Sequence, residues 1–291
     1  MSDPIWSPGP ARRQTANIRR FIELVRSELD PGISDYWSLY RFSIRHPRQF
    51  WRAVWDFCGI VGKPGYTAVD DAGQMPGARW FPEARLNFAE NLLRYRDDRP
   101  AILFKSENGA TSELTYEELH CLVARTAAAL EAAGIQPGDR VAGYLPNLPE
   151  TVVAMLAATS IGAVWSSCSP DFGIDGVVDR LGQIRPKVLF CADAYTYNGK
   201  VHDCRDKVQG IVKAIDSIQT VVVVPYVNPE ARIKKIRGAV WFDDFTDNDA
   251  TEVQFTRLPF DHPVFILYSS GTTGIPKCIT HGAGGLSLIH I

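Results

Sequence analysis

The sequence lacks the features that would indicate secretion, a membrane span or a polyanion partner. It has no N-x-[ST] sequon, its first twenty residues hold no apolar signal-peptide core, and its six cysteines form no C-x-x-C pair. The most apolar window, residues 152–165, is shorter than the roughly 20 residues of a membrane-spanning helix. With 31 Lys and Arg against 33 Asp and Glu, the formal net charge is -2, which gives no general attraction to nucleic acid. We predict a cytoplasmic protein with reduced thiols, no membrane span and no nucleic-acid partner.

The first eighty residues are rich in tryptophan. Five of the seven in the chain lie here, namely Trp6, Trp37, Trp51, Trp55 and Trp80. Residues 36–40 and 50–55 place aromatic and aliphatic side chains at helical spacing. An aromatic stripe at this spacing is usually core, so we predict a helical leader that packs around its own aromatics rather than a platform for a ligand.

From about residue 100, short apolar runs alternate with helical patterns. The runs are residues 101–104, 141–145, 163–165, 188–191 and 221–224. Thr115 and Glu118 form a capping box at the start of one helix, Pro149 marks the start of another, and residues 174–184 trace a third apolar face. Strands that alternate with helices of this length predict an α/β fold of parallel β-α-β units, with helices on both faces of the sheet.

Two kinds of charge cluster are interpreted as solvated surface. The basic run at residues 232–237 stands alone and has no interleaved aromatics, so it does not indicate a nucleic-acid site. The acidic pairs at residues 70–71 and 243–244 have no nearby histidine that would complete a metal site. We therefore predict that the protein itself has no dedicated metal-binding cluster.

Residues 264–277, with the sequence VFILYSSGTTGIPK, combine a buried strand with a loop suited to bind phosphate. Glycines let the main chain approach an anion, Ser and Thr add donors, and Lys277 adds a mobile positive charge. The loop is not a Walker A loop, because Pro276 and Cys278 flank the lysine where that motif has Gly and Ser or Thr. The pattern predicts a polyphosphate site of another class, and the alternative is a flexible Gly/Thr hairpin.

The stretch YSSGTTGIPK at residues 268–277 resembles the signature loop of the adenylate-forming superfamily, which includes acyl-CoA synthetases, luciferases and peptide-synthetase adenylation domains. Within this superfamily, residues 35–39, 80–82, 86–91 and 165–173 are most similar to the acetoacetyl-CoA synthetases. The resemblance covers nearly the whole length of the chain.

This resemblance implies a two-step ligase. ATP and acetoacetate would give an acyl-adenylate and pyrophosphate, and the thiol of coenzyme A would then displace AMP, in the metabolism of ketone bodies. Such chemistry needs positioning and charge neutralisation more than a protein nucleophile. Lys277 would add charge as pyrophosphate forms, and Thr272 would lie near a Mg²⁺ ion held mainly by phosphate oxygens. The residues implied to bind the ATP phosphates are Ser269, Ser270, Gly271, Thr272, Thr273, Gly274 and Lys277.

The resemblance also implies a coenzyme A site at Asn198, Gly199 and Lys200, a basic glycine-containing stretch that follows the strand at residues 188–191. The alternative for this stretch is an exposed turn. For the function, two alternatives stay open. One is another short-chain acyl-CoA synthetase acting on acetate, propionate or butyrate, and the other is a non-catalytic nucleotide-binding module.

The expected domain organisation is that of a partial enzyme. We expect residues 1–97 to form a leader domain of the acetyl-CoA-synthetase type and residues 98–285 an incomplete AMP-binding domain, because the family's adenine, ribose and adenylation-lysine motifs do not occur in the sequence. Residues 286–291, LSLIHI, match an in-frame translation of a sequencing adaptor, so we expect them to be foreign to the natural protein. The chain by itself is then expected to be inactive and poorly soluble.

Overall fold

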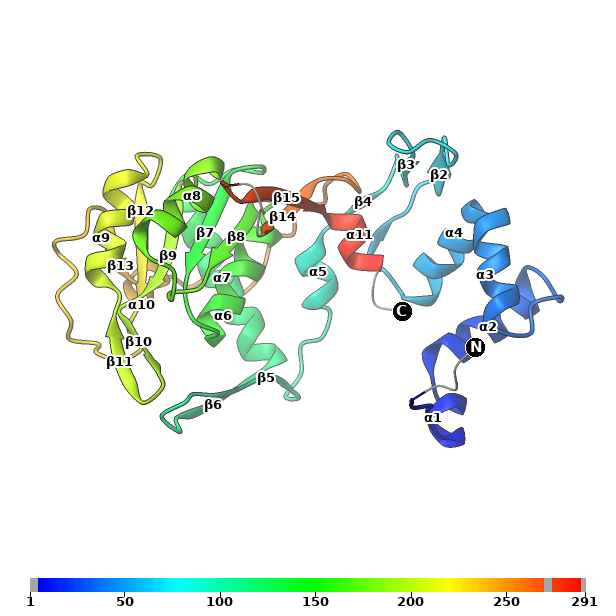
Figure 1. Ribbon diagram of the computed structural model, residues 1–291, viewed down its shortest axis with the longest axis horizontal. Helices are drawn as coiled ribbons and strands as arrows, with labels where there is room; N and C mark the ends of the chain where they lie inside the picture. Colours follow the sequence, from blue (N-terminus) through cyan, green and yellow to red (C-terminus); the bar gives the residue numbers. More distant parts are fainter. Residues whose placement is uncertain (1–4, 270–273, 289–291) are drawn as a thin grey trace.

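The computed structural model describes residues 5–269 and 274–288, which form a helical leader and a larger α/β lobe (Figure 1). The leader contains α1 (Pro10–Gln14), α2 (Asn17–Glu28), α3 (Tyr36–Arg45) and α4 (Pro47–Phe57), with two short strand pairs, β1 (Gly62–Lys63) with β4 (Arg85–Leu86) and β2 (Val69–Asp70) with β3 (Arg79–Trp80). The next helix, α5 (Phe88–Leu92), packs in the core of the larger lobe through Ala89. A capping box starts α3, because Ser38 N donates to Asp35 Oδ1 at 2.7 Å and Asp35 N donates to Ser38 Oγ at 3.0 Å.

The leader has its own apolar core, as the aromatic pattern predicts. Phe21, Val54 and Trp55 are buried in it, and Trp55 packs on Phe81 at 5.0 Å between ring centroids. Phe81 also stacks on Phe260 of the larger lobe at 5.2 Å, which joins the two parts of the molecule. The prediction is wrong for residues 36–40. Tyr36, Trp37 and Tyr40 are exposed, because α3 buries its opposite face through Leu39 and Phe42.

The larger lobe is built on one sheet. Among the described residues, seven strands lie in the order β13-β12-β9-β7-β8-β14-β15. Their bounds are β7 (Arg140–Tyr144), β8 (Val164–Cys168), β9 (Val188–Ala192), β12 (Thr220–Val224), β13 (Ala239–Trp241), β14 (Pro263–Ser269) and β15 (Lys277–Gly282). Every neighbouring pair is parallel except β14 and β15, which form an antiparallel hairpin. The predicted α/β fold of parallel units is confirmed.

Helices cover both faces of the sheet. α6 (Tyr116–Ala132) and α7 (Pro149–Ser160) pack on one face with Phe190, while α8 (Ile174–Ile184) and α9 (Arg205–Ala214) pack on the other with Leu189 and Cys191. These consecutive residues of β9 point to opposite faces, and all are fully buried. Deleting a fully buried phenylalanine ring from such a core costs about 3–5 kcal/mol. The remaining elements are the short helices α10 (Phe242–Phe245) and α11 (Ala283–Leu288) and the hairpin of β10 (Ala194–Tyr197) with β11 (Lys200–Asp203).

The predicted strand at residues 101–104 does not join the parallel sheet. It forms β5 (Pro100–Lys105), which pairs antiparallel with β6 (Thr111–Thr115) in a separate ribbon at the lower edge of Figure 1. A strand inside a parallel sheet is buried on both faces, whereas Leu103 of β5 is 73% exposed. The capping box at Thr115 is confirmed, since Glu118 N donates to Thr115 Oγ1 at 3.2 Å at the start of α6.

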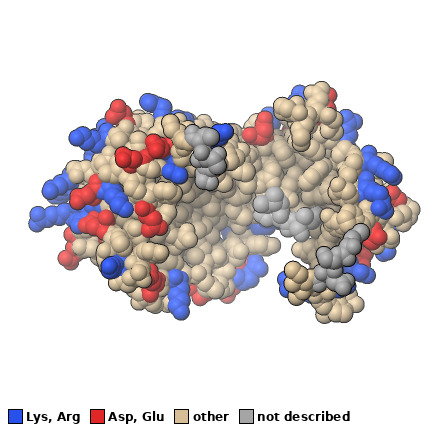
Figure 2. All heavy atoms as spheres, in the orientation of Figure 1, with Lys and Arg blue, Asp and Glu red and all other residues tan. Residues whose placement is uncertain are grey.

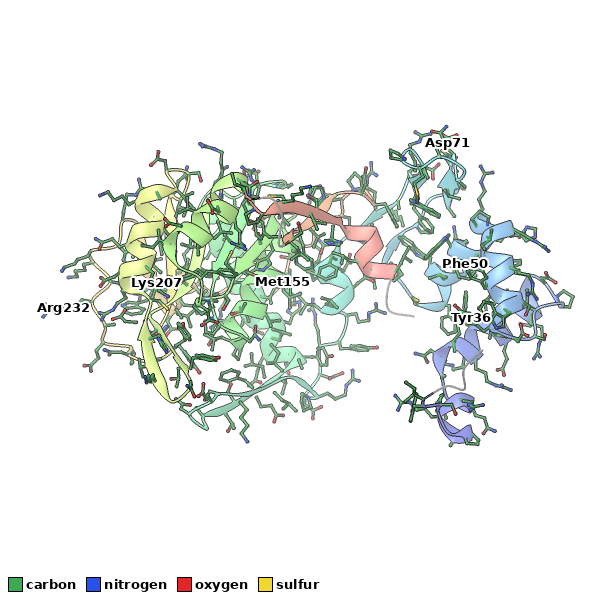
Figure 3. The ribbon with its side chains drawn as sticks, viewed as in Figure 1. Tyr36, Phe50, Asp71, Met155, Lys207 and Arg232 are labelled. Carbon is green, nitrogen blue, oxygen red and sulfur yellow. The ribbon has the colours of Figure 1, made fainter. Side chains whose placement is uncertain are left out.

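The charged side chains of the basic run at residues 232–237 lie on the surface, as interpreted from the sequence. Acidic and basic side chains are interspersed over the face shown in Figure 2. In the basic run, Ile233 and Ile236 are buried while the charged residues are exposed, and Arg232 points away from the molecule at its outer edge (Figure 3). The described residues contain no group of three or more His, Cys, Asp or Glu side chains that could hold a metal ion. Within the same ranges, no helix has both the length and the hydrophobicity to cross a bilayer.

The six cysteines are free thiols in the structure. Cys168, Cys191 and Cys204 are buried, and burial raises the pKa of Cys168 to about 11 and that of Cys204 to about 12. Buried thiols of high pKa carry little thiolate at neutral pH and are therefore unreactive. Cys278 is exposed, and Cys58 and Cys121 are half-buried.

The buried imidazole of His120 on α6 gives a pH prediction. His120 is 2% exposed, its Nε2 has no hydrogen-bond partner within the described part of the chain, and burial lowers its pKa below the usual 6.5. At pH values between 6.5, the usual pKa, and the lowered pKa of the folded state, the imidazole is protonated in the unfolded chain but not in the folded chain. The free energy of unfolding therefore falls as the solution is acidified. We expect His120→Leu to flatten this dependence in urea titrations from pH 8 to pH 5. Equal slopes for the two proteins would contradict this.

The outer face of the β14–β15 hairpin gives a solubility prediction. Leu267 and Ile279 lie directly opposite each other and are 48% and 45% exposed, and β15 is the last strand of the sheet in the described chain. An exposed apolar edge promotes association. We expect the 291-residue chain to associate, and Leu267→Lys with Ile279→Lys to reduce its apparent mass in light scattering. Leu103→Lys on β5 is the control, and an equal reduction by that variant would show that the hairpin is not the cause.

Candidate functional site

The parallel strands bring their carboxyl ends to one edge of the sheet. β8 lies on one side of β7 and β9 on the other, so the chain reverses its direction of winding beside β7. In open α/β sheets, ligands bind outside the carboxyl ends of the strands near such a reversal. β14 runs parallel to β8, and its last residue, Ser269, therefore arrives at this same edge. The tertiary structure thus places Ser269, the first residue of the predicted phosphate site, at the edge where sites form in this fold.

The two ends of the predicted phosphate loop are held together by strand pairing. Ser269 of β14 lies directly opposite Lys277 of β15 in the antiparallel register. Side chains that are directly opposite share one face of the hairpin, so the hydroxyl and the lysine start from the same side. Gly274 has a φ of +121°, a conformation that favours glycine. Of the other predicted residues, Ser270, Gly271, Thr272 and Thr273 lie outside the described residues.

The strand that carries the loop is attached to β8 by the hydroxyl groups of the buried Ser166 and the half-buried Tyr268. Ser166 Oγ on β8 donates to the carbonyl oxygen of Ile266 at 2.7 Å and lies 3.0 Å from the hydroxyl of Tyr268 on β14. Burial raises the pKa of Tyr268 well above its ordinary value, so the phenol stays neutral and remains a donor. These contacts join β8 and β14 beyond their single backbone pairing of Trp165 with Phe265.

The segment after β8, residues 169–173, is tied down by side chains from three other elements. Tyr144 Oη donates to the carbonyl oxygens of Pro170 at 2.8 Å and Phe172 at 2.9 Å, and Lys207 Nζ of α9 donates to Pro170 O at 3.1 Å. Lys207 reaches inward from the yellow-green helix in Figure 3. Arg180 of α8 stacks its guanidinium over the Phe172 ring at 4.4 Å. These contacts hold the segment in place beside the carboxyl end of β8.

Asp171 links this segment to the β10–β11 hairpin. Tyr195 Oη donates to Asp171 Oδ1 at 2.8 Å, and Ser169 Oγ donates to Oδ2 at 2.8 Å. These hydrogen bonds lower the pKa of Asp171, whereas burial, together with the bond to the carboxylate, raises the pKa of Tyr195 to about 12. The carboxylate is thus ionised at neutral pH and serves as a fixed acceptor.

The predicted coenzyme A residues form the tight turn of the β10–β11 hairpin. Asn198 and Gly199 have φ of +50° and +70°, and their backbone N–H groups donate to the carboxylate of Glu107 at 3.0 and 2.8 Å. Lys200 is exposed. The turn lies low on the larger lobe in Figure 1, away from the strands β14 and β15 near its top. The structure therefore does not bring these residues together with Ser269 and Lys277 at the ends of those strands, and the two amides of the turn bind an acidic side chain.

Sequence reasoning missed several residues that shape the site. Tyr144, Ser166, Arg180 and Tyr195 are separated in sequence from one another and from the loop, and no spacing rule connects them. The available signal was positional, because Tyr144 and Ser166 lie near the carboxyl ends of predicted strands, where site residues of this fold gather.

The family model described as "AMP-binding enzyme" matches residues 88–288, which is more than half of the chain. The chain belongs to this family. A second model, "Acetyl-coenzyme A synthetase N-terminus", matches residues 36–92.

This chain is similar to proteins named as acyl-CoA synthetases. It is 44% identical over 290 residues to the acetoacetyl-coenzyme A synthetase of Rhizobium meliloti (strain 1021), covering 99% of this chain and 44% of the relative. It is 39% identical over 289 residues to a malonamoyl-CoA synthetase of Penicillium aethiopicum, covering 93% of this chain and 39% of that protein. The solved acetoacetyl-CoA synthetase from Streptomyces lividans superposes with a TM-score of 0.92 at 40% identity, over 99% of this chain and 44% of that one. The chain thus spans less than half the length of these relatives.

The hydroxyl network under the loop gives a stability prediction. Ser166→Ala leaves the half-buried Tyr268 hydroxyl and the Ile266 carbonyl short of a partner, so we expect a loss of about 1–3 kcal/mol in the free energy of unfolding. Tyr268→Phe keeps the Ser166 bond to Ile266 and should cost less. Urea unfolding of both variants measures the difference. A smaller loss for Ser166→Ala than for Tyr268→Phe would contradict this arrangement.

Proposed function

We propose that the complete protein containing this sequence is an ATP-dependent acid-thiol ligase that converts acetoacetate, through an acyl-adenylate, to acetoacetyl-CoA with release of AMP and pyrophosphate. The observation that carries the proposal is the strand β14, which ends at the carboxyl edge of a parallel sheet in a Ser/Thr/Gly loop closed by Lys277. Family membership and the likeness to acetoacetyl-CoA synthetases support it.

In this proposal the loop binds the phosphates of ATP. The pairing of Ser269 with Lys277 puts a hydroxyl and a cation on one face of the hairpin, where both can meet phosphate oxygens. Lys277 is exposed and free to follow the charge that develops as pyrophosphate leaves. In the described ranges no acidic or histidine cluster competes for a metal, so Mg²⁺ would arrive with the nucleotide and keep most of its ligands as phosphate and water oxygens. Thr272 is proposed to lie near that ion.

The acyl substrate is proposed from the relatives' names. Acetoacetate and malonamate are both short acids with a carbonyl group at the β carbon. The relatives named for them match nearly the whole chain. A preference for such acids over plain acetate or butyrate would fit both names. Coenzyme A is proposed as the acyl acceptor, with Asn198, Gly199 and Lys200 as its contacts, and a phosphate there would have to displace Glu107 from the two backbone N–H groups.

Residues 1–97 are proposed as the leader domain, residues 98–285 as the part of the AMP-binding domain present here, and residues 286–291 as foreign to the natural protein. The location proposed for the complete enzyme is cytoplasmic.

The test is ATP–pyrophosphate exchange by the complete protein. We expect exchange with acetoacetate to exceed exchange with malonamate, 3-hydroxybutyrate, butyrate and acetate. Lys277→Met should lower kcat by about 10²-fold, because one cation facing developing charge is lost. The matched control is Lys213→Met, which removes an exposed lysine from α9. Exchange with acetate or butyrate in place of acetoacetate would indicate another short-chain synthetase, and nucleotide binding without exchange would indicate a binding module.

A further inference from the structure

The side-chain amide of Gln183, near the end of α8, reaches across to the strand that follows the phosphate loop. Its Nε2 donates to the carbonyl oxygen of Pro276 at 2.9 Å and to that of Asp179, in its own helix, at 2.6 Å. Its Oε1 accepts a weak hydrogen bond from the thiol of Cys278 at 3.7 Å. Both amide protons and the amide oxygen are therefore used. In Figure 1 the first residues of β15 lie beside α8, as these contacts require.

The two β15 contacts flank Lys277. Pro276 and Cys278 are its neighbours in the chain, so Gln183 holds the main-chain carbonyl before the lysine and the side-chain thiol after it. Because successive side chains of a strand point to opposite faces, turning Cys278 toward Gln183 turns Lys277 to the other face. That face is the one shared with Ser269.

This second attachment matters because β15 has a backbone neighbour on one side only in the described chain, the strand β14. A slip of one residue in a strand paired on one side would exchange the faces of Lys277 and Cys278. The contact with α8 opposes such a slip from outside the hairpin. Tyr268, which pairs with Cys278, is itself fixed through Ser166, so the register is held at adjacent positions from two elements.

We propose that Gln183 is a positioning residue that sets the register of β15 and thereby the place of the Lys277 ammonium group beside the phosphates. The inference rests on the proposed function, since it acts through the role assigned there to Lys277. Gln183 itself touches neither nucleotide nor acid in this proposal. Small displacements of a charged group from the reacting atoms lower the rate strongly, so a residue of this kind affects kcat more than the affinity for the acid.

The experiment is a double-mutant cycle in the complete protein, measured by ATP–pyrophosphate exchange. Gln183→Met keeps the length of the side chain and removes its hydrogen bonds. We expect kcat to fall about tenfold, in line with the loss of one or two hydrogen bonds, with the KM for the acid unchanged. In the Lys277→Met background the same substitution should cause no further loss, because the group being positioned is gone.

The matched control is Gln209→Met on α9. That glutamine also donates its Nε2 to a backbone carbonyl, that of Lys235 at 3.2 Å, but lies away from the loop. We expect its exchange kinetics to equal those of the wild type. Thermal unfolding of all variants identifies any loss of activity that comes from loss of fold.

Gln183→Glu adds a pH dependence of kcat that is not expected if Gln183 serves only in packing. Above the carboxyl pKa, its oxygens face the carbonyl oxygens of Pro276 and Asp179, and kcat should be at least as low as for Gln183→Met. Once protonated, the acid can donate to Pro276, so activity relative to wild type should rise as the pH is lowered toward 5. This rescue keeps the inference testable even where Gln183→Met folds poorly.

The outcomes separate the two proposals. Wild-type protein that shows no exchange with any acid overturns the proposed function. Normal wild-type exchange with Gln183→Met indistinguishable from Gln209→Met overturns the positioning role alone. The positioning role is also overturned if the two reductions in kcat multiply in the Gln183→Met, Lys277→Met double variant, because Gln183 would then affect kcat independently of Lys277.

Discussion

The burial of both faces of the parallel sheet is the constraint on which the rest of the structure depends. Parallel strands need crossover helices, and those helices must cover the sheet on both sides. In this protein α6 and α7 take one face and α8 and α9 the other, and consecutive residues of β9 serve both cores. The same connectivity sends every parallel strand toward one edge, so the position of the site follows from the way the core is buried.

At that edge the structure combines a short antiparallel element with the parallel frame. The β14–β15 hairpin returns the chain immediately after the loop, which brings Ser269 and Lys277 together by backbone pairing rather than by side-chain contacts. Backbone pairing fixes register, while the hydroxyl of Ser166 and the amide of Gln183 fasten the two strands to β8 and α8. Ser166 and Gln183, which bind no ligand in the proposed mechanism, thus hold the two strands that carry Ser269 and Lys277.

The leader is joined to this frame through aromatic stacking. It has its own core around Phe21 and Trp55, and Phe81 contacts Phe260 across the boundary. The exposed Tyr36, Trp37 and Tyr40 show that tryptophan and tyrosine at helical spacing do not identify the buried face, because a short helix has a solvent side that can carry large rings as well.

From the sequence it was possible to predict the fold class, the strands β7, β8, β9, β12 and β14 and the starts of α6 and α7, because hydrophobic period and capping residues act over a few neighbouring residues. The phosphate loop stays a prediction from its glycine-hydroxyl-lysine pattern. The sequence did not reveal that residues 101–104 leave the sheet, since pairing partners are chosen by burial on two faces. Nor did it connect Ser166 with Tyr268, Asp171 with Tyr195, or Gln183 with Pro276, which are 102, 24 and 93 residues apart. Only the tertiary structure decided these contacts, because strand order and helix packing bring distant residues together and leave no periodic trace in the sequence.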